Sequence, residues 1–95
     1  MANKRNLKKD IQSIFSELLA ECYTLSYIFP QIDKTKVDAI AINIIEKSDD
    51  FVKRAGKPDG KENPSIVKTY YKKLYKDVAE TVAVIIQDIH ALKSN

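Results

Sequence analysis

Apolar residues recur along the first third of the chain at helical spacing. The steps are of three or four residues, and the stripe consists of Leu7, Ile11, Ile14, Leu18, Cys22, Leu25 and Phe29, widened by Phe15 and Leu19. Such steps place side chains on one face of an α-helix. The pattern predicts a helix over about residues 5–29, which ends before Pro30 because proline disfavours helical dihedral angles in the residue that precedes it.

A second stripe predicts a helix over about residues 34–55. Its apolar positions are Val37, Ile40, Ala41, Ile44, Ile45, Phe51, Val52 and Ala55. Asp33 precedes it and can accept a hydrogen bond from a free amide of the first turn. Gly56 follows it and suits the left-handed conformation that is common after a helix.

A third stripe predicts a helix over about residues 64–93, after a loop over residues 56–63 that is rich in glycine and proline. The apolar positions are Val67, Tyr71, Leu74, Val78, Val82, Ile85, Ile89 and Leu92. Asn63 is a capping residue, and Pro64 suits the first helical position because its missing amide hydrogen would be unpaired there in any case.

Three amphipathic helices with short connections predict one all-α domain over residues 1–95. We expect an up-down-up antiparallel three-helix bundle, and a dimer would complete a larger bundle. The third helix is the longest, so we expect it to project past the others or to take part in a partner interface.

Composition places the chain among folded, water-exposed proteins. Of 95 residues, 44% are hydrophobic and 31% are charged, with a net charge of +3. The apolar stretches are shorter than the roughly 18 residues of a membrane span, and the basic N-terminus lacks the apolar region of a signal peptide. A single cysteine excludes an internal disulfide. We therefore expect a cytoplasmic protein with no membrane partner.

Charge is distributed unevenly over the expected bundle. The antiparallel arrangement assigns twelve basic and six acidic residues to one end, and four basic and seven acidic residues to the other. A solvated surface is the usual explanation of such a run of charge, and an anion site is the alternative. The candidate anion-binding residues are Lys4, Arg5, Lys8, Lys9, Lys68, Lys72, Lys73 and Lys76.

Three tyrosines alternate with lysines between Lys68 and Lys76, as in some nucleic-acid-binding surfaces. Helical spacing places Tyr71 in the core stripe and Tyr75 at its edge, which leaves only Tyr70 free. One exposed ring does not form a stacking platform, and a net charge of +3 is low for a dedicated nucleic-acid binder. Binding of a polyanion or nucleic acid is therefore the alternative hypothesis for this chain.

Catalytic and metal chemistry finds little support in the residues present. Cys22 and His90 are the obvious nucleophile and base. Counting along parallel first and third helices places Cys22 beside Val82, and His90 roughly 12 Å further along. No pattern for zinc, calcium or phosphate binding occurs. We expect no enzymatic activity, no cofactor and no metal; a site formed only between subunits is the weakest of the hypotheses.

A few apolar residues fall outside the stripes and form a candidate interface. These residues are Leu19, Tyr23, Tyr27 and Ile42, which counting along antiparallel helices places close together. Tyrosine is enriched at interfaces because its ring is apolar and its tip polar. Single exposed apolar residues are also common on monomers. The sequence does not name a biological process; we expect a non-enzymatic protein-interaction module that binds a second copy or another protein.

Overall fold

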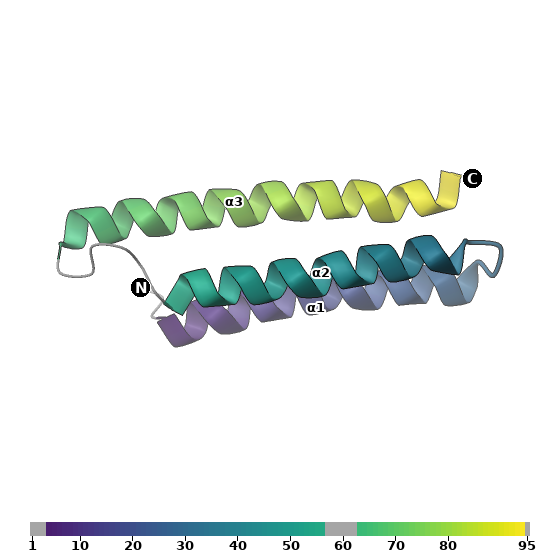
Figure 1. The fold of residues 1–95 in the computed structure, drawn as a ribbon, viewed down its shortest axis with the longest axis horizontal. Coiled ribbons are helices and arrows are strands. Elements are labelled where there is room, and N and C mark those ends of the chain that lie inside the picture. The colour runs from purple at the N-terminus through teal and green to yellow at the C-terminus, as the bar shows by residue number, and fades with distance from the viewer. Residues whose placement is uncertain (1–3, 57–62, 95) are drawn as a thin grey trace.

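A computed structural model describes residues 4–56 and 63–94. It contains α1 (Lys4–Ile28), α2 (Lys34–Gly56) and α3 (Pro64–Ala91), and a 3₁₀ turn, η1 (Leu92–Ser94), follows α3 directly. The predicted all-helical class with three α-helices is confirmed, and the described residues contain no strand. Figure 1 shows the three helices side by side along the long axis of the molecule. Within the described ranges no helix combines the length and hydropathy that a membrane span requires.

Side chains cap the helices where the sequence predicts. Asp33 Oδ1 accepts a 2.8 Å hydrogen bond from the amide of Thr35 at the start of α2. Asn63 Oδ1 accepts hydrogen bonds from the amides of Ser65 and Ile66, at 3.0 and 3.4 Å. These bonds satisfy amides that have no partner within the first helical turn.

Gly56 departs from its expected role. It is the last residue of α2 and does not adopt the left-handed conformation predicted for it. The end of the Lys8 side chain lies beside it instead, since a β-carbon at position 56 would stand 3.0 Å from Lys8 Cε and Nζ. A cation is favourable at this position because the C-terminal end of a helix carries partial negative charge.

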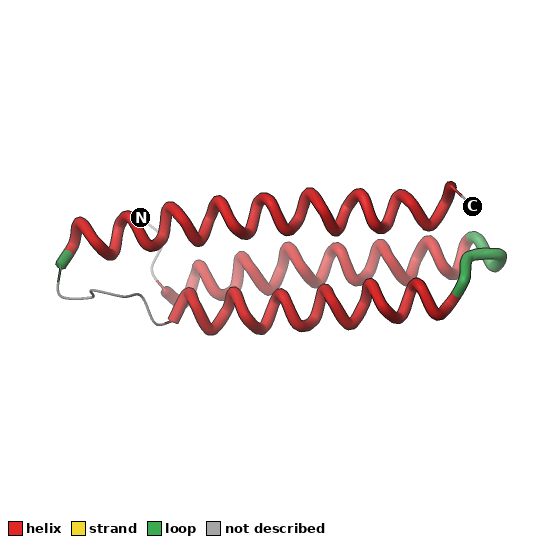
Figure 2. Tube along the Cα trace, turned by 45° about the horizontal axis from the view of Figure 1, so that its top comes forward, coloured by secondary structure: helices red, strands yellow, loops and turns green. Residues whose placement is uncertain are grey.

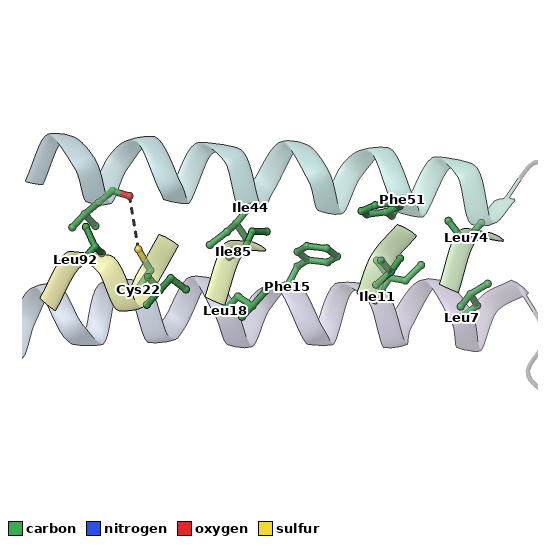
Figure 3. Close-up of a cluster of buried hydrophobic side chains, with 14 of the residues drawn as sticks. Leu7, Ile11, Phe15, Leu18, Cys22, Ile44, Phe51, Leu74, Ile85 and Leu92 are labelled. Atoms are coloured by element: carbon green, nitrogen blue, oxygen red, sulfur yellow. Dashed lines mark hydrogen bonds between the residues drawn. The ribbon is translucent and has the colours of Figure 1, made fainter. Parts of the chain in front are cut away.

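The chain turns back on itself between α1 and α2, which form the closest pair of helices. The rings of Phe15 and Phe51 stack with their centroids 5.9 Å apart and their planes 21° from parallel. Near the connection, the Cys22 thiol donates a 3.8 Å hydrogen bond to the carbonyl of Val37, which Figure 3 shows as a dashed line. These pairs join the middle of α1 to the end of α2, and the end of α1 to the start of α2.

One hydrophobic core joins all three helices (Figure 3). Two residues that the periodicity places in it are exposed instead. Ile14 is 40% exposed whereas Phe15 is 1% exposed, and Ile45 is 56% exposed whereas Ile44 is 1% exposed. Adjacent helical positions differ by about 100° around the axis. Phe15 points into the core, where it stacks on Phe51, and Ile14 is therefore directed to the edge of the core. In α2, Ile44 points into the core and Ile45 is directed away from it.

The helix α3 is attached to the end of α2 by polar groups and extends past it. The hydroxyls of Tyr70 and Tyr71 donate to the carbonyls of Arg54 and Ala55, at 2.9 and 3.1 Å. Figures 1 and 2 both show the Pro64 end of α3 beyond the ends of α1 and α2. The expected projection of the third helix is therefore present, and it is formed by the turns that precede Tyr70.

Candidate functional site: the surface formed by α1 and α2

A shallow groove runs between α1 and α2, and no residue of α3 lines it. Its volume is about 260 Å³. The lining residues are Gln12, Phe15, Ser16 and Leu19 from α1, and Ile44, Ile45, Ser48, Asp49 and Val52 from α2. Leu19 and Ile45 make part of the lining apolar, and Gln12 and Asp49 make part of it polar.

Large apolar side chains at and near this groove are exposed to solvent. Ile45 and Ile42 are each 56% exposed, and Tyr23 is 49% exposed. Tyr23 lies one turn after Leu19 on α1, and Ile42 lies one turn before Ile45 on α2. We call Leu19, Tyr23, Ile42 and Ile45 the α1–α2 face. Contiguous exposed apolar side chains of this kind mark interaction surfaces more often than isolated ones do.

The candidate interface residues of the sequence analysis have different environments. Tyr23 and Ile42 are exposed, and Leu19 is partly buried because it packs against the core. Tyr27 is 88% exposed and lies near the end of α1, one further turn from the groove. The sequence did not identify Ile45 as an interface residue, because its spacing also fits the core stripe of α2. Its position three residues after the off-stripe Ile42, on the same side of the helix, was the available signal.

The outward positions of α1 beside the α1–α2 face carry no charge. Between Ile11 and Ile28 the only charged residues are Glu17 and Glu21. Apart from Ile14, the exposed uncharged positions in this range are Gln12, Ser13, Ser16, Ala20, Tyr23, Thr24 and Tyr27. A helix face in contact with water is ordinarily rich in lysine and glutamate, whereas the centres of interfaces are depleted of charge.

The candidate anion-binding residues fall on two helices. On α1, Lys8 is partly buried beside Gly56 and Lys9 is exposed; Lys4 and Arg5 are helical, and their side chains lie outside the described part of the structure. On α3, the exposed lysines are Lys68, Lys72, Lys73 and Lys76. Tyr70, which the sequence leaves free, is instead partly buried and bonded to the Arg54 carbonyl.

A polar network surrounds the end of α2. Arg54 Nη2 donates a 2.8 Å hydrogen bond to Asp77 Oδ2, and the guanidinium lies 5.3 Å from the centroid of the Phe51 ring. The bond from Arg54 lowers the pKa of Asp77 and raises the pKa of Arg54 itself. Burial raises the pKa of the Tyr71 phenol. All these groups have partners within the fold, so the network holds α3 on α2.

Cys22 and His90 do not form a reactive pair, although one expectation about them is wrong. Figure 3 shows Cys22 between Ile85 and Leu92 along the core, and both of these residues come after Val82, the neighbour that counting predicts. The reason is that α3 begins beyond the start of α1, so every residue of α3 is shifted along the bundle. Cys22 has no exposed surface, burial raises its pKa, and His90 is exposed on the outside of α3.

No group of three His, Cys, Asp or Glu side chains that could hold a metal ion occurs among the residues described. Comparison with known proteins gives no match, whether to a family model, to a curated protein or to a solved structure. What the protein does must therefore be inferred from the chemistry of its own surfaces.

Proposed function

We propose that this chain is a small non-enzymatic interaction module, an up-down-up bundle that binds a second copy of itself through the α1–α2 face. The observation that carries the proposal is the exposure of Tyr23, Ile42 and Ile45 beside a groove whose α1 side has no charged residue. Burial of half-exposed aromatic and aliphatic side chains is the main source of interface stability.

The surface area of the chain supports a partner. The accessible surface is 6721 Å² for a chain of 10.8 kDa, whereas a compact monomer of this mass exposes about 5,500 Å². The excess arises because the molecule is slender, with extents of 52 × 20 × 19 Å. A standard interface buries about 800 Å² on each partner, so one long face of this molecule offers enough area.

Charge favours an antiparallel second copy. The end of the molecule at which α1 begins has eight basic and five acidic side chains: Lys8, Lys9, Lys53, Arg54, Lys68, Lys72, Lys73, Lys76, Asp10, Asp49, Asp50, Asp77 and Glu80. The opposite end has three basic and four acidic side chains: Lys34, Lys36, Lys93, Glu21, Asp33, Asp38 and Asp88. A parallel copy would bring two basic ends together, and an antiparallel copy separates them.

A two-fold axis beside Ile45 fits this arrangement. Ile45 is the central residue of α2, so an axis there aligns the two copies of that helix along their whole length. A two-fold interface uses the same residues twice, and the two Ile45 side chains would lie near each other. Lys53 lies eight residues after Ile45 and Asp38 seven residues before it, so each Lys53 would approach Asp38 of the partner subunit.

The proposed setting is the cytoplasm. Cys22 is free and fully buried, and a lone thiol without a disulfide partner fits a reducing compartment.

Single substitutions with a matched control test the proposal. Ile45→Glu and Tyr23→Glu place a carboxylate in the α1–α2 face, and Val84→Glu places one on α3, where Val84 is 55% exposed and Ile45 is 56% exposed. Sedimentation velocity should show a dimer for the unaltered chain and for Val84→Glu, and a dissociation constant raised at least about 100-fold for the two face variants. Circular dichroism should show equal helix content in all four proteins.

Two outcomes would contradict the proposal. One is equal dimerisation of Ile45→Glu and Val84→Glu, which would place the interface elsewhere. The other is a monomer for every protein at all concentrations, which would mean that the α1–α2 face does not bind a second copy.

A further inference from the structure

Four lysines gather on the outward side of the first half of α3. Lys68, Lys72, Lys73 and Lys76 are all exposed, and none forms an ion pair with another described residue. No acidic residue occurs in α3 before Asp77, and Asp77 is bonded to Arg54. We call these four residues the α3 lysine patch.

The spacing of the patch concentrates positive charge along one line. Lys68, Lys72 and Lys76 recur every four residues, so they share one side of the helix over roughly 12 Å. Like charges four residues apart destabilise a helix by a few tenths of a kcal/mol for each pair. The row therefore opposes the stability of α3, and a bound polyanion would remove that repulsion.

The fold presents this patch at a fixed position. The start of α3 extends past α1 and α2 and includes Lys68, and the other three lysines follow on the exposed side of the same helix (Figures 1 and 2). The hydrogen bonds of Tyr70 and Tyr71 to carbonyls of α2 hold the helix in place behind it.

We propose that the α3 lysine patch binds the phosphate backbone of double-stranded nucleic acid without sequence preference. A duplex carries one phosphate charge per 1.7 Å of its axis when both strands are counted, so about 12 Å of duplex carries roughly seven charges on its two strands. The inference uses different residues from the α1–α2 face and does not depend on the proposed function.

The neighbouring side chains favour a duplex over other anions. Single strands are held mainly by stacking of successive bases on several free aromatic rings, and here only Tyr75 is exposed, because Tyr70 and Tyr71 are partly buried with their hydroxyls bonded to α2. A helix that inserts into an anionic membrane needs a continuous apolar face beside its lysines. Leu74 and Val78 of α3 are buried in the core, which leaves only Ile66 and Tyr75 as exposed large apolar side chains in this half of α3. Of these ligands, the duplex matches the regular row of lysines best, because its phosphates are regularly spaced.

Two triple variants of the full chain with equal net charge test the inference. Lys68→Gln, Lys72→Gln and Lys76→Gln neutralise the row, and Lys34→Gln, Lys36→Gln and Lys47→Gln neutralise three exposed lysines of α2. The probe is a fluorescent 20-base-pair duplex of mixed sequence, followed by anisotropy from 20 to 200 mM NaCl. The same strand unpaired, polyglutamate and vesicles containing phosphatidylserine are the comparison ligands.

We expect the unaltered chain to bind the duplex at 20 mM NaCl and to lose affinity steeply with salt. The α3 triple should weaken binding at least tenfold and reduce the slope of log K against log salt by about 2.7, which is 0.9 for each lost phosphate contact. The α2 triple should weaken binding less than threefold. Equal losses in the two triples, tighter binding of any comparison ligand, or no binding at 20 mM NaCl would each overturn the inference.

Discussion

Arg54 and Asp77 join α2 to α3 through a 2.8 Å hydrogen bond between their charged groups. The guanidinium of Arg54 also lies over the Phe51 ring, and Phe51 stacks on Phe15 of α1. A series of contacts therefore runs from α3 through α2 to α1. Both charged side chains are about 30% exposed or less, so water weakens this pair less than it weakens the exposed pair of Asp49 and Lys53.

The ion pair predicts an acid-dependent loss of stability. Arg54 holds the pKa of Asp77 in the folded protein below its ordinary value. The ion pair therefore contributes fully to stability above the pKa that Asp77 has in the unfolded chain, and this contribution is lost as the pH falls through the lower pKa of the folded state. The free energies of unfolding of the unaltered chain and of Asp77→Asn in urea should therefore differ most at pH 7, begin to converge as the pH falls below about 4, and become equal only below the lowered pKa of Asp77. A difference that stays constant from pH 7 to pH 2 would contradict this account.

The hydrogen bond from the Tyr71 hydroxyl to the end of α2 predicts a measurable loss of stability when that hydroxyl is removed. Tyr71→Phe keeps the ring and leaves the Ala55 carbonyl without its 3.1 Å partner. The free energy of unfolding should fall by about 1 kcal/mol, the usual net value of a neutral hydrogen bond. Tyr75→Phe is the control, because Tyr75 is 52% exposed, and its effect should stay within about 0.5 kcal/mol. Equal effects of the two substitutions would argue against the bond.

Burial of Cys22 predicts an unreactive thiol. Its side chain has no exposed surface, and burial raises its pKa, so little thiolate is present at neutral pH. Reaction with a disulfide reagent such as DTNB should be at least about 100-fold slower in the folded protein than in urea, because it requires opening of the core. A native thiol that reacts as fast as the unfolded one would show that α1 and α3 separate easily.

The antiparallel register predicts a charge reversal that can be compensated. Lys53→Asp and Asp38→Lys should each weaken the dimer about threefold to tenfold, because each places like charges near each other across the interface. The double variant should recover an affinity within about threefold of the unaltered chain. Additive losses in the double variant, measured by sedimentation, would exclude this register.

The helices and their ends follow from local chemistry and could be predicted from the sequence. Pro30, Asp33 and the pair Asn63-Pro64 act on neighbouring amides and dihedral angles, and each acts on the position expected for it. Periodicity also identifies Tyr23 and Ile42 as residues outside the core. These properties depend on residues within one or two helical turns.

Features that depend on how one helix is placed against another could not be predicted in this way. Tyr70 was expected to be exposed and unbonded. Because α3 extends past the end of α2, the Tyr70 hydroxyl instead reaches the Arg54 carbonyl. The same shift places Cys22 between Ile85 and Leu92 along the core. Ile45 belongs to the candidate site because the orientation of α2 about its own axis directs Ile44 into the core and leaves Ile45 exposed. Periodicity does not distinguish these two residues, because adjacent helical positions are only about 100° apart.

Sedimentation equilibrium of the unaltered chain is the most direct test of the central claim that the α1–α2 face binds a second copy. Measured from low micromolar to several hundred micromolar, the mass should approach twice 10.8 kDa, and Ile45→Glu should stay near 10.8 kDa over the same range. A mass of 10.8 kDa for the unaltered chain at every concentration would contradict the claim.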